Sequence, residues 1–362
     1  MCTKINYINP KRKIAISVRT MDFASPTGQK FGLIKKKQKK QNQVEGTENG
    51  TTKFDFKAKF SDIGFVFAGK HFGVRTVSDG LNEAGLSLGT LWLPQTSFDA
   101  SVKIPADCLS GLTLPQLILG TCATVADVIK LFDAAPSINP DGEEVLVGKK
   151  RVNVPVEYIQ QYATIHLGLA DPSGAQYVVE FESRDGKAGV PVFYKDPYGV
   201  LTNAPKFSWH KENLRNYVGL TEKFNITKGK VMGHEMATTG FGNNQRSLPG
   251  SGLPADRYVR AVMLKSLALD EAEPKDTNEA MLLLDKVIGT TIVIKGTSAN
   301  HSTLSPDVDW TQWTTVHDMT NFKLYQKADT DLGYSELVCN TVKLECDLSE
   351  AQIANVEQQN DQ

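Results

Sequence analysis

The sequence lacks several features that mark whole classes of protein. Its formal net charge is −1 over 362 residues, so no face-wide excess of lysine and arginine is available for bulk nucleic-acid binding. It has no apolar run of about 18 residues, so we expect no membrane span. The first residues also lack the basic-then-apolar layout of a signal peptide. As written, the sequence predicts a cytoplasmic protein; a leader trimmed upstream would instead make it periplasmic or secreted.

Cysteine and histidine are few and scattered. The five cysteines include no Cys-x-x-Cys pair, and the six histidines include no His-x-x-x-His or His-Glu-x-x-His spacing. We therefore expect neither a disulfide framework nor a metal site. The cysteines beyond position 2 are expected to be buried small apolar residues. They are Cys108, Cys122, Cys339 and Cys346.

The position of one cysteine stands out. Cys2 follows Met1 directly, and removal of Met1 would leave Cys2 with a thiol and a free α-amine on one residue. Such a residue carries its own nucleophile and its own base, as N-terminal threonine nucleophiles do. A strand with alternating apolar residues is predicted over residues 14–19, with Arg19 near its end and Asp22 three residues later.

An arginine near a thiol favours the thiolate, and a carboxylate can orient an amine. These residues alone leave two interpretations open. Cys2 is either a catalytic nucleophile or an incidental small second residue, with Arg19 and Asp22 forming an ion pair in a turn.

The rest of the chain predicts blocks of strands and blocks of helices. We expect a turn at Asp79–Gly80, a hairpin over residues 162–181, and strands near the end of the chain. Helices are predicted with Pro115 in a first turn, from the capping-box spacing at Thr124, from Pro254, and over residues 278–288. Contiguous blocks favour an α+β fold with antiparallel sheets and segregated helices.

Two polar segments have uncertain roles. The basic block at residues 35–40 favours a solvated loop or hairpin tip, with recruitment of an anionic substrate or surface as the alternative. Residues 219–253 predict a long glycine-rich loop of the kind that often carries function. Residues 137–156 are also predicted to be rich in loops.

Five stretches together resemble the choloylglycine hydrolase family of N-terminal nucleophile hydrolases, which includes bile salt hydrolases and penicillin V acylases. They are residues 1–3, 19–22, 81–86, 201–205 and 252–257, with supporting segments at 119–125 and 169–174. Each motif is weak alone, but five in this order with an N-terminal cysteine are specific. The resemblance covers essentially the whole chain and favours Cys2 as the nucleophile.

The resemblance implies a four-layer αββα sandwich, one domain over residues 2–362 after loss of Met1, and a homotetramer. It implies that Cys2 attacks a small-molecule amide without a cofactor, through an acyl thioester. Arg19 would support the thiolate and Asp22 would hold the α-amine. Asn203, through its side chain, and Asn82, through its backbone, would form the oxyanion hole. Arg257 would complete the charge environment.

Substrate choice is left open by the motifs. Asn82 resembles the bile salt hydrolases, whereas Trp92 is similar to the Gram-negative branch, which includes penicillin V acylases and enzymes that cleave N-acyl homoserine lactones. Candidate pocket walls are Phe23, Phe65 and Trp92, which are explained equally well as core aromatics. The alternatives are an acylase of lactone signals and a catalytically silent binding protein. The latter is disfavoured by the full set of catalytic residues.

Overall fold

The structure is a computed structural model, and it describes most of the chain. The described residues are 2–24, 30–34, 39–44, 52–68, 75–102, 104–105, 107–111, 113–156, 164–221, 228–238, 243–300 and 307–337. Met1, the strand predicted near residue 343, most of the basic block at 35–40, Cys339 and Cys346 lie outside them.

Two antiparallel sheets form the centre of the molecule. The seven-stranded sheet has the order β17-β1-β2-β21-β22-β23, with β20 beside β21, and the nine-stranded sheet has the order β11-β12-β16-β15-β14-β8-β7-β6-β3. The strands of the first sheet are β1 (Cys2–Asn9), β2 (Ile14–Phe23), β17 (Val200–Leu201), β20 (Ser298–Asn300), β21 (Asp307–Asp318), β22 (Lys323–Ala328) and β23 (Ser335–Leu337). Those of the second are β3 (Lys30–Ile34), β6 (Asp62–Ala68), β7 (Arg75–Asn82), β8 (Ser87–Trp92), β11 (Ala134–Ile138), β12 (Glu144–Gly148), β14 (Ile165–Ala170), β15 (Gln176–Arg184) and β16 (Lys187–Lys195).

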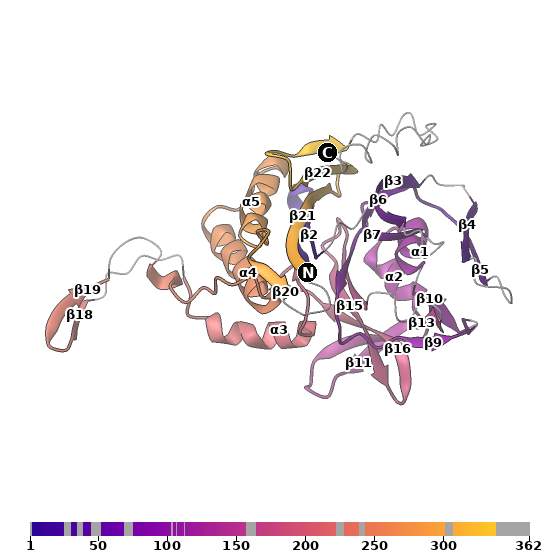
Figure 1. Ribbon diagram of the computed structural model, residues 1–362, viewed down its shortest axis with the longest axis horizontal. Helices are drawn as coiled ribbons and strands as arrows, with labels where there is room; N and C mark the ends of the chain where they lie inside the picture. The colour runs from indigo at the N-terminus through magenta and orange to yellow at the C-terminus, as the bar shows by residue number, and fades with distance from the viewer. Residues whose placement is uncertain are drawn as a thin grey trace.

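Helices cover the outer faces of both sheets (Figure 1). The long helices α4 (Pro254–Glu271) and α5 (Thr277–Gly289) pack on β1 and β2, and α1 (Leu114–Thr121) packs on β7 and β8. Near α1, α2 (Val125–Leu131) contributes to the same apolar cluster. The result is the predicted four-layer αββα sandwich.

Smaller elements complete the fold. They are the hairpins β4 (Lys39–Val44) with β5 (Thr52–Lys57) and β18 (Lys228–Val231) with β19 (His234–Ala237), the three-stranded sheet of β9 (Asp99–Ser101), β10 (Cys108–Ser110) and β13 (Arg151–Pro155), helix α3 (Phe207–Asn213), and the 3-10 turns η1 (Pro10–Arg12), η3 (Leu214–Tyr217) and η4 (Asn243–Gln245).

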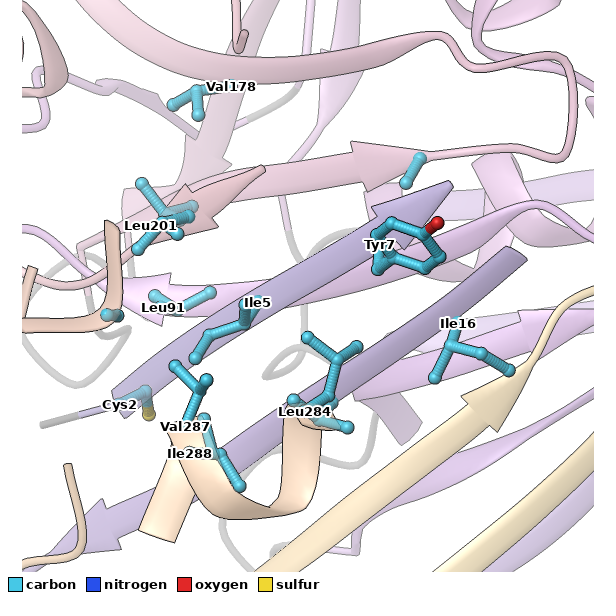
Figure 2. Close-up of a cluster of buried hydrophobic side chains, with 14 of the residues drawn as sticks. Cys2, Ile5, Tyr7, Ile16, Leu91, Val178, Leu201, Leu284, Val287 and Ile288 are labelled. Atoms are coloured by element: carbon cyan, nitrogen blue, oxygen red, sulfur yellow. The ribbon is translucent and has the colours of Figure 1, made fainter. Parts of the chain in front are cut away.

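Strand β1 presents different chemistry on its two faces, because alternate side chains of a strand point to opposite sides. Its outer face, Thr3, Ile5 and Tyr7, looks toward α4 and α5. Figure 2 shows Ile5 beside apolar side chains of α5. Its inner face, Cys2, Lys4 and Asn6, looks toward the nine-stranded sheet, where Lys4 reaches β8. All six side chains are buried.

The local helix signals predict the helices well. Pro115 lies in the first turn of α1, and Thr124 caps α2 through a complete capping box, as the sequence predicts. Pro254 begins α4, and α5 covers the predicted segment within one residue at each end. The predicted hairpin is formed by β14 and β15.

Three expectations about turns and loops are wrong. Asp79–Gly80 lies inside β7, paired with Phe65 and Gly64 of β6, and the turn instead follows Asn82. Residues 137–156 contain most of β11, β12 and β13. The segment 219–253 contains a hairpin, β18–β19. Strand pairing decided the first two cases, and local turn propensity does not report it.

Candidate active site

Cys2 lies at the start of β1, buried at 5% exposure, with partners from β2 and from the segment that follows β17. Arg19 Nη2 donates to Cys2 Sγ at 3.4 Å and to the carbonyl oxygen of Thr90 at 2.7 Å. The Cys2 backbone nitrogen donates to Asn203 Oδ1 at 2.6 Å. The guanidinium thus contacts the sulfur of Cys2, and the nitrogen held by Asn203 is the one that would become an α-amine on loss of Met1.

Register explains why Asn203 reaches the start of β1. Strand β17 pairs with β1, with Leu201 opposite Lys4 and Val200 opposite Ile5. Two residues further along the antiparallel ladder, Asn203 therefore comes opposite Cys2. Its own backbone oxygen is held by His210 Nε2 at 2.8 Å. Burial lowers the pKa of His210 to about 4, so this ring is neutral near pH 7.

Arg257 connects the elements of the site. It lies in the first turns of α4 and is fully buried. Its Nη1 donates to the Cys2 carbonyl oxygen at 2.9 Å and to Thr3 Oγ1 at 2.5 Å, and its Nη2 donates to Asn203 Oδ1 at 3.0 Å. Burial lowers the pKa of Arg257, and the nearby Asp22 acts in the opposite direction.

Asp22 follows a β-bulge in β2 and lies on the helix side of the sheet, with Arg257 Nη1 at 3.5 Å. Thr311 Oγ1 donates to its Oδ1 at 2.5 Å and Thr20 Oγ1 to its Oδ2 at 3.3 Å. Burial raises the pKa of Asp22, and Arg257 opposes that shift. The predicted role of Asp22 in holding the α-amine stays a prediction.

Asn82 is not brought to this group, and the oxyanion role predicted for its backbone is not supported by the geometry. Its N–H donates to the Leu86 carbonyl oxygen within the turn that joins β7 to β8. Its side chain accepts from the backbone of Ala84 and Leu86 and donates to two carbonyl oxygens at the end of α1. Strand β8 separates that turn from Trp92 by five residues, roughly 16 Å.

Trp92 stands at the opposite end of β8, beside Asn203. Asn203 Nδ2 donates to the Trp92 carbonyl oxygen at 2.8 Å. The Leu93 N–H donates to the Thr164 carbonyl oxygen, so the peptide groups of residue 93 face β14. Successive residues of an antiparallel strand direct their N–H and C=O groups to alternate sides, so those of residues 90 and 92 point away from β14. The Thr90 carbonyl oxygen accordingly bonds Arg19. The Trp92 N–H points to the same side, toward Asn203.

A large cleft opens next to these residues, with a volume of about 1080 Å³. Phe23 and Trp92 both line it and are each 45% exposed, so they are not core aromatics; their contact with substrate stays a prediction. Leu253 and Ile294 add further exposed apolar surface to its wall. The side chain of Phe65 lies outside the described part of the structure, so its predicted pocket role stays a prediction.

Some contacts of the site carry no sequence signal. Thr3 and Thr311 bond the two charged residues Arg257 and Asp22, and Thr90 contributes only a carbonyl oxygen. Threonine is common in strands, so nothing local distinguishes these positions. By contrast, His166 is buried and bonded to the Thr202 carbonyl oxygen, as expected of a sheet histidine without a catalytic role.

Within the described residues, no three His, Cys, Asp or Glu side chains gather as a metal site requires. Cys108 and Cys122 are buried and free, as expected for apolar use of cysteine. No helix among the residues that can be described is long and apolar enough to cross a membrane.

Comparison with known sequences identifies relatives over most of the chain. The family of linear amide C–N hydrolases named for choloylglycine hydrolase matches residues 2–352. Penicillin V acylase of Pectobacterium atrosepticum is 26% identical over 90% of this chain and 77% of its own length. Conjugated bile acid hydrolase of Lactobacillus acidophilus is 28% identical over 63% of this chain and 65% of its own length, just under two thirds.

Solved structures agree on the fold. A mutant of the conjugated bile acid hydrolase from Clostridium perfringens superposes with a TM-score of 0.74 at 20% identity, covering 94% of this chain and 93% of that one. Penicillin V acylase from Agrobacterium tumefaciens gives a TM-score of 0.65 at 21% identity, covering 94% and 87%. At such identity the likeness shows the fold alone.

Proposed function

Because the chain belongs to the choloylglycine hydrolase family of linear amide C–N hydrolases, we propose that it cleaves a conjugated bile salt or penicillin V type of amide with Cys2 as the nucleophile. The observation that carries the proposal is the arrangement at the first residue of β1. The Cys2 thiol lies 3.4 Å from the Arg19 guanidinium, and its backbone nitrogen lies 2.6 Å from Asn203 Oδ1.

The reaction begins with loss of Met1, which converts the Cys2 nitrogen to an α-amine. That amine takes the thiol proton, and Sγ attacks the amide carbon to form a tetrahedral intermediate. Collapse of the intermediate breaks the C–N bond, and the amine returns the proton to the leaving nitrogen. A water molecule then hydrolyses the thioester and frees Sγ. Arg19 stabilises the thiolate, while Arg257 and Asp22 hold the Cys2 main chain in place.

The developing oxyanion needs donors aimed at it. An amide nitrogen carries two hydrogens, so Asn203 retains one N–H beyond its bond to the Trp92 carbonyl oxygen. The Trp92 backbone N–H, directed to the same side, is the second donor in our proposal. It takes the place that the sequence assigned to the backbone of Asn82, whose N–H is bonded within its turn.

The acyl group is assigned to the cleft beside the site. Phe23 and Trp92 join the cleft to the catalytic residues, because Phe23 follows Asp22 and Trp92 bonds Asn203. Exposed Leu253 and Ile294 give the cleft an apolar wall that suits a steroid, an aryl group or a long acyl chain. Because the cleft suits a long acyl chain, an acylase of N-acyl homoserine lactones is the second candidate.

Amine release from a panel of four substrates tests the proposal. The panel contains glycocholate, taurocholate, penicillin V and a long-chain acyl homoserine lactone. Release from a cholate or from penicillin V supports the proposed substrate class, and release from the lactone alone supports the second candidate. Release from none contradicts both and returns a silent binding protein as the interpretation.

Intact mass tests the mechanism independently of the substrate. We expect the mature chain to lack Met1, because the proposed base is the α-amine of Cys2. A chain that keeps Met1 and still hydrolyses an amide would contradict that mechanism.

We also propose that the protein assembles as a homotetramer, with the hairpin β18–β19 as an assembly arm. All eight of its strand residues are exposed, and it stands away from the sandwich (Figure 1). Val231, Met232 and Met236 place exposed apolar side chains on it, which is typical of an interface. Light scattering should show a tetramer for the full chain and a smaller species for Val231→Asp with Met236→Asp. A full-chain monomer would refute the proposal.

A further inference from the structure

A buried lysine lies on the same strand face as the nucleophile. Lys4 is 1% exposed and follows Cys2 on the inner face of β1, roughly 7 Å along the strand. Arg19 of β2 lies directly opposite Lys4 in the ladder, and Thr315 of β21 lies beyond Arg19. The stems of two cationic side chains therefore share one row of the sheet, next to the row of Cys2, while the Lys4 ammonium is bonded to Ser17, which lies opposite Asn6 in the following row.

The opposing sheet is shaped to receive this lysine. Gly89 of β8 and Gly168 of β14 are cross-strand neighbours. A Cβ atom at either glycine would lie 3.1 Å from Lys4 Cδ, and at Gly89 it would also lie 3.3 Å from Arg19 Cδ. The missing side chains at these two positions make room for both stems.

Lys4 belongs to a hydrogen-bonded chain that ends at a carboxylate. Its Nζ donates to Ser17 Oγ at 2.5 Å and Ser87 Oγ at 2.8 Å. Ser87 Oγ lies 2.9 Å from His317 Nδ1, and His317 Nε2 lies 3.0 Å from Asp79 Oδ2. Although serine, histidine and aspartate are the members of a hydrolytic triad, all three here are fully buried between the sheets, so no substrate reaches them.

Charged and polar groups face Lys4 from five strands. Arg19 comes from β2, Asp79 from β7 and His317 from β21, while β8 and β14 present Ser87, the two glycines and the bonded ring of His166. Burial alone would raise the pKa of Asp79, but His317, Arg19 and Lys4 hold it below its usual range. Burial lowers the pKa of His317, and Asp79 acts in the opposite direction.

Lys4 itself is charged at neutral pH. Burial lowers its pKa to about 8, with Asp79 acting to raise it. Two cations and one anion leave this cluster with one uncompensated positive charge. A thiolate at Cys2, which Arg19 already touches, neutralises it.

We propose that Lys4 is a second cation, beside Arg19, that stabilises the Cys2 thiolate, with Asp79 as its counter-charge in the opposite sheet. Lys4 does not touch the substrate and acts as a positioning and electrostatic residue. The inference rests on Cys2 being the nucleophile of the proposed function. It adds a residue that none of the motifs above includes.

The test measures thiolate formation rather than turnover. The mature full chain is treated with iodoacetamide across the neutral pH range, and alkylation of the N-terminal peptide is followed by mass spectrometry, which separates Cys2 from the other cysteines. For Lys4→Met, which keeps the stem and removes the charge, we expect the alkylation midpoint to rise by about half a pH unit to one unit. An unchanged midpoint in a folded Lys4→Met protein overturns the proposal.

Matched variants separate charge from packing. Ser17→Ala removes one hydrogen bond from Lys4 but leaves its charge, and Lys4→Arg keeps a cation; both should keep the wild-type midpoint. If Ser17→Ala shifts the midpoint as much as Lys4→Met does, packing and not charge is responsible, and the proposal fails. Should Lys4→Met not fold, Lys4→Gln retains a donor for the serines and is held to the same criterion.

The measurement requires no substrate. A protein that releases amine from none of the four panel compounds still gives an alkylation midpoint for each variant. Failure of the proposed function and failure of the role of Lys4 are therefore distinguishable.

Discussion

The two faces of β1 differ in the chemistry of their side chains. Its outer face contributes Ile5 and Tyr7 to an apolar cluster with α5, the usual means by which a sheet is stabilised. Its inner face places a thiol and a lysine between the two sheets, where a sandwich ordinarily has its apolar core. Burying these polar groups opposes folding, so the outer cluster must stabilise a strand whose inner face carries the polar groups to which we assign the chemistry.

The largest expected effect is on the inner face. Cys2→Ala should lower turnover by about 10⁴-fold or more, because no other group replaces the nucleophile. The free energy of unfolding should change by no more than about 1 kcal/mol, since only one buried sulfur is lost. Amine release and urea denaturation check the two parts. Full activity in a folded Cys2→Ala protein would show that Cys2 is not the nucleophile and that the inner face of β1 does not differ from the outer face in this way.

Asn203, which meets the start of β1 from β17, should show the next largest effect. Asn203→Ala is expected to reduce kcat by about 10²–10³-fold, the usual cost of one oxyanion donor. Asn203→Asp is the matched control, because it keeps an acceptor for the Cys2 nitrogen and Arg257 but loses the donor. Similar losses in both variants support the donor role. Recovery of most activity in Asn203→Asp would show that holding the Cys2 nitrogen is what matters.

For the outer face of β1 we expect a loss of stability rather than a loss of rate. Ile5 is fully buried among the α5 side chains, and Ile5→Ala should lower the free energy of unfolding by about 2–5 kcal/mol. The kcat of the folded fraction should stay within about twofold. Denaturant titration and active-site-normalised kinetics measure these quantities. A large fall in kcat with unchanged stability would show that the two faces are not separable.

Substitution of Asn82, like substitution on the outer face of β1, should lower stability rather than kcat. Its side chain bonds two carbonyl oxygens at the end of α1 and two N–H groups of its own turn. Asn82→Ala leaves these groups unpaired and should cost about 1–3 kcal/mol of stability, with kcat nearly unchanged. Glu83→Ala, in the same turn, is the control for turn effects. A 100-fold loss of kcat in Asn82→Ala would place this turn near the chemistry after all.

Local chemistry in the sequence predicted the parts of the protein that depend on neighbouring residues. The proline and capping signals at Pro115, Thr124 and Pro254 correctly predicted the starts of three helices. Such signals are readable because a cap or a first turn involves residues only a few positions apart. The motifs also placed Arg19 near the Cys2 thiol, and the two are in contact.

Tertiary structure decided which residues meet. Asn82 and Asn203 have the same side chain, and the family resemblance implied an oxyanion role for both. Asn203 reaches Cys2 across 201 residues because β17 pairs with β1, whereas Asn82 is held within its own turn. The Asp79–Gly80 pair, predicted to form a turn, lies within a strand, where the Asp79 carboxylate faces two cations from the other sheet.

The sequence by itself thus determined the helix starts and the antiparallel α+β class, and it singled out Cys2 as the candidate nucleophile. The partner of each polar side chain was decided only when the sheets faced each other, because hydrogen bonds and buried charges depend on distances that strand register and sheet packing set.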